Sequence, residues 1–285
     1  YNTAVGSRSL EDNSTGANNT AVGYQSLFAN TTGASNVALG ASTLSANTTG
    51  GANTAVGARS LLANTTGAEL TALGNHALHN NTTGNYNNAT GVYSLYSNTT
   101  GSNNTANGYR ALFVNTTGAS NVALGAYALN GNTTASNNTA IGRSAISSNT
   151  IGTSLVAIGT NALYSNTTAA NNIAIGHEAL FYNTTGSENT AVGRSALVSN
   201  VSGSNNTAIA YGALNDNTTG VQNIAVGRNA LGSNTTAANN TAVGYASLSA
   251  NTTGHSNVAL GGNALDANTT ASNNTAVGYQ AGYSN

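Results

Sequence analysis

The stretch that decides the fold runs from Asn19 to Ser35 and reads NTAVGYQSLFANTTGAS, because the whole chain repeats this pattern every 17 residues without an insertion or deletion. We number the repeat from position 1 at Asn19 to position 17 at Ser35. The glycine of position 5 recurs along all 285 residues with one exception, Ala210. A fixed short period predicts stacked units, each of which packs only against its neighbours.

The composition excludes several classes of protein. The chain has no cysteine, so neither a disulfide framework nor a cysteine-ligated metal site is expected. Charged residues make up 5% and the net charge is -1, which argues against binding to nucleic acid. No apolar run is long enough to span a membrane in this segment. Because the chain starts and stops within a repeat, we expect residues 1–285 to be a single continuous solenoid of about 17 repeats, within a longer protein.

The repeat predicts short strands joined by tight turns. Positions 2 and 4 are mostly Thr, Val, Ile or Leu around an alanine at position 3, which suits a pleated strand over positions 1 to 4. A second strand is expected around positions 8 to 10, with turns at the position 5 glycine and at N-T-T-G. The fold class is therefore all-β, a parallel β-solenoid or β-roll with one 17-residue coil per repeat.

Two registers of the first strand are open. We favour the one in which positions 2 and 4 point inward with the leucine of position 9, since a strand that buries only alanine removes little apolar area from water. The alanine row then forms an outer packing face. In the other register alanine points inward and the aliphatic rows form an exposed stripe. Either register predicts that the protein associates with itself. The predicted core residues are Val22, Leu27, Leu39, Leu44, Val56 and Leu61, and the predicted packing face is Ala21, Ala38, Ala55 and Ala72.

Position 12 is asparagine in every unit, and position 1 is asparagine except at Leu70 and Leu155. In stacked coils, an asparagine side chain can hydrogen-bond its equivalents in the coils on either side, which would hold the register. The predicted structural ladder comprises Asn13, Asn30, Asn47, Asn64, Asn81, Asn98, Asn115, Asn132, Asn149, Asn166, Asn183, Asn200, Asn217, Asn234, Asn251 and Asn268.

The same segment contains N-x-S/T sequons, so glycosylation at Asn30, Thr31, Asn47 and Thr48 is possible. The unit that contains Asn149 keeps its asparagine but lacks the sequon, because Ile151 follows Thr150. This favours a structural role for the asparagine row over attachment of glycans.

No group of residues points to catalysis. His76 and His79 are three residues apart but lie at variable positions without cysteine or carboxylate partners, so a metal site is not expected. His177 and Glu178 suit a solvated turn, and Ser195 lacks both a G-x-S-x-G context and a base. With the acidic residues scattered, we predict no catalytic, cofactor or metal site and no enzyme activity. Tyrosines recur at positions 6 and 10, where they could stack on sugars or on other copies of the chain.

The units Asn36–Gly40 (N-V-A-L-G) and Asn172–Gly176 (N-I-A-I-G) resemble the N-S-V-A-I-G signature of the heads of trimeric autotransporter adhesins of the YadA type. Units such as Asn19–Gln25 also look like repeats of bacterial and phage tail-fibre-like proteins. The resemblance implies a left-handed β-roll, trimeric association and an extracellular adhesive or fibre role. The present repeat is longer, and N-T-T-G enlarges one of its turns.

We therefore expect an extracellular or cell-surface structural and adhesive fibre protein. The expected partners are further copies of itself, as a trimer or laterally packed filament, and surface glycans or host and cell surfaces. An ice-binding solenoid that acts through regular Thr and Asn ladders, such as Thr31, Thr48, Thr65, Thr82 and Thr99, is the alternative. A carbohydrate-processing enzyme would require a cluster of carboxylates, which the sequence does not show.

Overall fold

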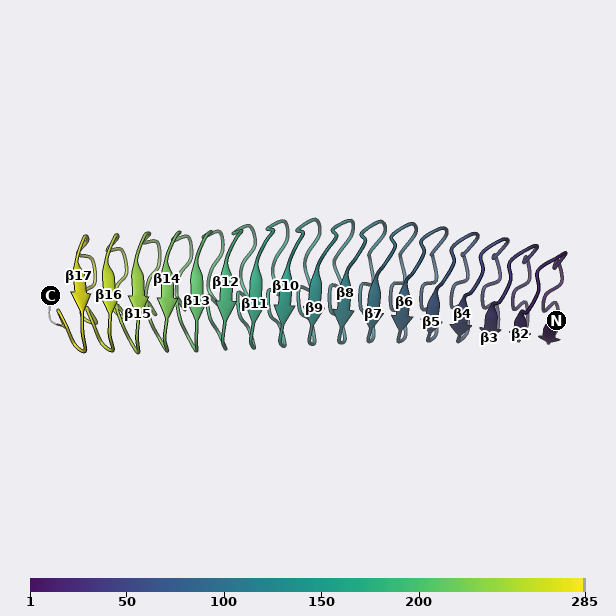
Figure 1. Cartoon of the computed structure of the whole chain (residues 1–285), viewed down its shortest axis with the longest axis horizontal. Coiled ribbons are helices and arrows are strands. Elements are labelled where there is room, and N and C mark those ends of the chain that lie inside the picture. Colours follow the sequence, from purple (N-terminus) through teal and green to yellow (C-terminus); the bar gives the residue numbers. More distant parts are fainter. Residues whose placement is uncertain (284–285) are drawn as a thin grey trace. The chain divides into compact units, whose positions relative to one another are not determined.

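The structure of the protein, a computed structural model, describes residues 1–283. It comprises two compact units, Tyr1–Arg143 and Ser144–Asn285, which we call unit 1 and unit 2. In both units each repeat contributes one strand of three residues, and turns make up much of the remainder (Figure 1). The predicted fold class, a parallel β-solenoid with one coil per 17-residue repeat, is confirmed. That residues 1–285 form one continuous body stays a prediction.

Unit 1 contains a parallel sheet in which each strand pairs with the next one in sequence, in a register that places alanine beside alanine, as in Ala21 beside Ala38. Its strands are β1 (Thr3–Val5), β2 (Thr20–Val22), β3 (Val37–Leu39), β4 (Thr54–Val56), β5 (Thr71–Leu73), β6 (Asn88–Thr90), β7 (Thr105–Asn107), β8 (Val122–Leu124) and β9 (Thr139–Ile141).

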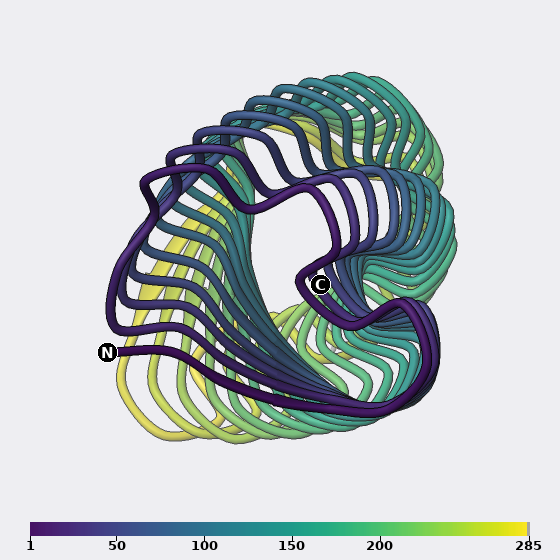
Figure 2. The same ribbon diagram turned by 90° about the vertical axis from the view of Figure 1, so that its right-hand side faces the viewer.

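Unit 2 repeats the same arrangement, with Ala174 beside Ala191 as an example of its register. Viewed along the strands' stacking direction, successive coils within each unit follow nearly the same outline (Figure 2). The strands of unit 2 are β10 (Val156–Ile158), β11 (Ile173–Ile175), β12 (Thr190–Val192), β13 (Thr207–Ile209), β14 (Ile224–Val226), β15 (Thr241–Val243), β16 (Val258–Leu260) and β17 (Thr275–Val277). No helix of membrane-spanning length occurs within residues 1–283.

The prediction of a second strand around positions 8 to 10 is wrong, because these residues form turns. The backbone enters the left-handed region at positions 7 and 9, with φ of 54° at Gln25 and 51° at Leu27. Left-handed φ angles are unfavourable for leucine. Here the conformation lets the Leu27 N–H donate to the Thr43 carbonyl of the next coil at 3.0 Å, while the side chain is fully buried. The hydrogen bond and the burial offset the local strain.

The N-T-T-G segment links neighbouring coils through a single carbonyl. The backbone N–H groups of Thr31, Thr32 and Gly33 all donate to the Thr48 carbonyl, at 3.0, 3.1 and 3.3 Å. The Thr31 hydroxyl donates to the same oxygen at 3.0 Å. The hydrogen-bond donors of this turn are therefore paired within the stack, as buried backbone groups require.

The favoured register of the strand is also wrong. Alanine at position 3 is fully buried in the coils between the two terminal ones, as at Ala21, Ala38, Ala55 and Ala72, so these residues belong to the core and not to an outer packing face. The predicted core residues Val22, Leu39 and Val56 point outward and are each 37% exposed. The other three, Leu27, Leu44 and Leu61, are fully buried as predicted.

The space inside each coil explains why alanine points inward. Position 9 of the last coil is Gly282, and a Cβ placed there would lie 3.6 Å from the Ala276 Cβ and 2.9 Å from Leu265 Cδ2. Positions 3 and 9 therefore face each other across a narrow interior, which the leucine side chains fill. Leucine or valine at position 3 would overpack that interior. The apolar area of the strand alone favours the other register, but the leucine that lies opposite already fills the interior.

Candidate functional surface

The most extensive candidate surface is the outer face of the parallel sheet, which we call the sheet face and which consists of positions 2 and 4 of every strand. In unit 2, position 4 is Val, Ile or Leu in every strand, and Ile175, Ile209 and Val243 are 36%, 39% and 38% exposed. Position 2 adds Ile173 and Ile224. Because adjacent strands lie about 4.8 Å apart, neighbouring side chains touch along each row. The exposed parts therefore form a continuous apolar stripe.

In unit 1 the same stripe is interrupted by amide and hydroxyl groups. Strands β6 and β7 place Asn88, Thr90, Thr105 and Asn107 on the sheet face. The Thr90 hydroxyl approaches the Asn88 side-chain oxygen at 3.4 Å. Aliphatic side chains return at β8 and β9. The sheet face of unit 1 is thus apolar at both ends and polar in between.

The predicted asparagine ladder is confirmed. Asn47 Nδ2 donates to Asn30 Oδ1 at 2.8 Å in unit 1, and Asn217 Nδ2 donates to Asn200 Oδ1 at 2.8 Å in unit 2. Each amide also donates within its own coil, as Asn47 Nδ2 does to the Gly50 carbonyl at 2.9 Å. From Asn30 to Asn268 the residues of this ladder are almost completely buried. The ladder therefore belongs to the interior. Each hydrogen bond in it offsets the cost of removing an amide group from water.

Position 1 forms a second asparagine row with a different pattern. The Asn36 backbone N–H donates to Asn19 Oδ1 at 2.9 Å, and Asn36 Nδ2 reaches the Gly50 carbonyl at 2.9 Å. The two asparagine rows thus converge on the carbonyl of position 15. Leu70 accommodates the break in this row by donating its backbone N–H to Asn53 Oδ1 at 3.0 Å.

Burial bears directly on the possible glycosylation sites. Asn30 and Asn47 are fully buried, and each Nδ2 is already hydrogen-bonded to two acceptors. An N-glycan is attached at that nitrogen, so the prediction for these two asparagines is wrong for the folded chain. Thr31 and Thr48 are half-buried, and each hydroxyl donates to the next coil at 3.0 Å. Modification of these hydroxyls stays a prediction, and it would remove the hydrogen bonds.

Positions 6, 7 and 10 lie at one outer corner of the coil, and in unit 1 this corner carries a cluster of rings. His79 stacks on Tyr96 with ring centres 5.0 Å apart, and Tyr96 stacks on Phe113 at 5.3 Å. The Arg110 guanidinium lies 4.9 Å from the centre of the Phe113 ring. Burial in this cluster, followed by the charges of His79 and Arg59, lowers the pKa of His76. Stacked rings turn their faces toward one another, so these faces already have partners within the cluster.

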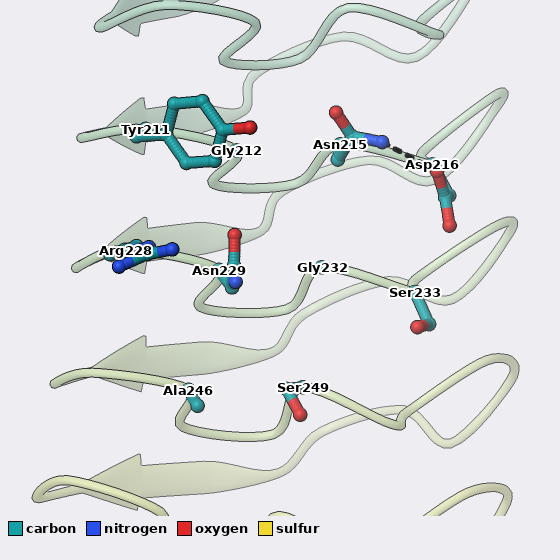
Figure 3. Close-up of a pocket in the computed structure, with 10 residues that line it drawn as sticks. All are labelled: Tyr211, Gly212, Asn215, Asp216, Arg228, Asn229, Gly232, Ser233, Ala246 and Ser249. Atoms are coloured by element: carbon teal, nitrogen blue, oxygen red, sulfur yellow. Dashed lines mark hydrogen bonds between the residues drawn. The ribbon is translucent and has the colours of Figure 1, made fainter.

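In unit 2 the corresponding corner is hollowed, next to strands β13 to β15. A polar hollow of about 470 Å³ is lined by residues that include Tyr211, Asn215, Asp216, Arg228 and Asn229 (Figure 3). The sequence reasoning did not identify it. The signal was available, because Gly212, Gly232 and Ala246 stand where other repeats often have large side chains. Only the fold shows that these three residues share one corner.

Among residues 1–283, no group of three or more His, Cys, Asp or Glu residues could hold a metal ion. His76 and His79 stack with ring centres 5.1 Å apart, as members of the ring cluster. The His177 Nδ1 atom lies 3.5 Å from a Glu178 carboxylate oxygen, with both side chains partly exposed. Ser195 is a turn residue with φ of 56°.

No protein-family model matches the chain, and no curated protein matches it at a significant level.

Proposed function

We propose that this chain is a structural and adhesive repeat protein of an extracellular or cell-surface fibre. It associates with further copies through the sheet face and presents its polar turns as a multivalent surface. The apolar stripe of unit 2, in which position 4 is exposed in six of the eight strands and half-buried in the other two, is the observation that carries this proposal. An apolar stripe of this length is costly to leave in water, and a second copy covers it with matching spacing.

The resemblance of the N-V-A-L-G and N-I-A-I-G units to adhesin heads supports the same role. Repetition supports the adhesive part of the proposal, because many weak contacts on one rigid unit add up to tight attachment. Positions 6, 7 and 10 of the turns vary widely in sequence, whereas position 12 is always asparagine and position 9 is leucine in all repeats but those of Ile146 and Gly282.

Sedimentation of purified protein tests the self-association. Ile175→Lys combined with Val243→Lys places two charges on the sheet face of unit 2. Ile151→Lys combined with Val201→Lys is the matched control, since these exposed residues lie in turns away from that face. We expect oligomers for the natural chain and the control, and 28.1 kDa monomers for the sheet-face variant. Circular dichroism checks that each variant is folded. A monomeric natural chain would refute the proposal.

Ice binding is the second candidate, and one observation favours it. Position 2 presents threonines such as Thr190, Thr207 and Thr241 outward on the sheet face, at the regular spacing of β-strands. The Asn ladder and the position 13 threonines fit this role less well, because the asparagines are buried and the Thr48 hydroxyl donates to the Thr65 carbonyl. Thermal hysteresis of the purified chain distinguishes the candidates, since a purely structural protein shows none.

A further inference from the structure

The hollow in unit 2 exists because three side chains are small. Gly212 and Ala246 occupy position 7, and Gly232 occupies position 10, where Phe28, Tyr96 and Phe181 stand in other repeats. A Cβ on Gly212 would lie 2.7 Å from Asn229 Oδ1, so glycine makes room for that amide. The volume of the hollow, about 470 Å³, is within the range of about 300–1,000 Å³ typical of small-molecule sites.

The backbone beside the hollow carries strain. Ala210 stands at position 5, which is glycine in all other repeats, and has φ of 108°. That angle lies in a region that residues with a Cβ rarely adopt. Ala210 still donates its N–H to the Val192 carbonyl at 2.8 Å, so the ladder of the sheet is intact. Strained residues held in place by their surroundings cluster at binding sites, and this one directly precedes Tyr211.

The lining offers both donors and acceptors in a small space. Asn215 Nδ2 donates to Asp216 Oδ1 at 2.7 Å, which orients both side chains at one side of the hollow. Asn229 and Arg228 lie on the next coil, and the Tyr211 hydroxyl points toward the hollow (Figure 3). Asp216 and Arg228 carry opposite charges, so the formal charges of the lining cancel. An anion would meet the Asp216 carboxylate as well as the Arg228 guanidinium.

Such a lining suits a compound with many hydroxyl groups. Each sugar hydroxyl both donates and accepts, which matches amide, carboxylate and guanidinium groups close together. Tyr211 is 47% exposed, and its ring, which has the Arg228 guanidinium 5.6 Å from its centre, adds an apolar surface for the C–H face of a pyranose. The hollow is open to solvent, so longer glycans can enter with one residue bound. The geometry points to a binding site for a neutral pyranose residue of a glycan. This inference rests on the adhesive role proposed above, which it makes specific.

Saturation-transfer NMR on the full chain tests the site, with D-glucose, D-galactose, D-mannose and N-acetyl-D-glucosamine as probes. Gly232→Phe fills the hollow with a side chain that other repeats carry at the same position. Ser45→Phe is the matched control, because it makes the same addition at position 10 in unit 1. We expect transfer to at least one sugar for the natural chain and Ser45→Phe, and none for Gly232→Phe. Asp216→Ser, which removes one hydrogen-bonding group, weakens binding by about tenfold.

Three results would overturn the site: no transfer to any of the four sugars, equal transfer with Gly232→Phe, or loss of transfer with Ser45→Phe. Stronger transfer to D-glucuronate than to the neutral sugars would overturn the assignment of a neutral ligand. Sedimentation of the same samples keeps the two proposals apart. Intact oligomers without sugar binding refute this site alone, whereas monomers that bind sugar refute the self-association alone.

Discussion

The outer corner formed by positions 6, 7 and 10 differs between the coils of β5 to β7 in unit 1 and the coils of β13 to β15 in unit 2, although the backbone beneath it is the same. In unit 1 it is filled by rings, with Tyr96 stacked between His79 and Phe113. In unit 2 it is hollowed at Gly212 and Gly232. The φ angles of the buried leucines below are nevertheless 49° at Leu95 and 50° at Leu231. The inner rows therefore hold the coil, and the outer corner is free to vary in shape and chemistry.

The largest effect is expected from substitutions in the interior, and it tests whether the two units have the same kind of core. Leu95→Ala and Leu231→Ala each remove a fully buried side chain from a narrow core. We expect each to lower the free energy of unfolding by about 2–5 kcal/mol, and by similar amounts in the two units. Urea unfolding followed by circular dichroism measures this. Leu62→Ala, on the half-buried outer corner, is the control and costs less. A clearly larger loss in one unit would contradict a shared interior.

An intermediate effect is expected from exchanging the two kinds of corner. Tyr96→Ser removes two stacked contacts, with His79 and with Phe113, and we expect a loss of about 1–2 kcal/mol of unfolding free energy. Gly232→Phe makes the opposite change in unit 2, where position 10 of the two neighbouring coils is Asn215 and Ser249 and offers no ring for stacking along that row. Its effect on the urea midpoint is expected to be small. A loss for Gly232→Phe as large as that for Tyr96→Ser would show that the corner does shape the fold.

The smallest expected effect comes from pH. Burial lowers the pKa of His76 below its ordinary value of 6.5, and the neighbouring charges of His79 and Arg59 add to this shift. The unfolded chain then binds a proton more readily than the folded one, so stability falls as the pH drops through and below about 6.5. Because the side chain is largely solvated, the change in urea midpoint is slight. His76→Gln abolishes this part of the pH dependence, and an unchanged profile in that variant would rule out His76 as its source.

Several features were predictable because they depend on periodicity alone. The 17-residue period requires stacked coils, and the asparagine of position 12 then meets its equivalents at the spacing of hydrogen bonds, as Asn47 meets Asn30. Leucine at position 9 is the largest apolar side chain in phase with the repeat, so its burial at Leu27 also followed. These inferences need no knowledge of which parts of one coil face each other.

The second strand could not be excluded from sequence, because its residues look suited to a strand. The left-handed angles at Gln25 and Leu27 are imposed by bonds to the coils on either side. The glycosylation sites failed for a similar reason. A sequon describes three consecutive residues, whereas the burial of Asn30 depends on Asn13 and on the turn of its own coil.

The sequence by itself determined the stacked coils, their exact period, and the leucine and asparagine rows that hold them together. The tertiary structure decided which side of the Thr-Ala-Val strand points inward. Alternation divides a strand into two faces but does not say which one is buried, and that choice depends on what lies opposite. Here leucine from the turn fills the narrow interior and leaves room for alanine alone. The aliphatic rows are thereby turned outward, where they form the surface that we propose for association.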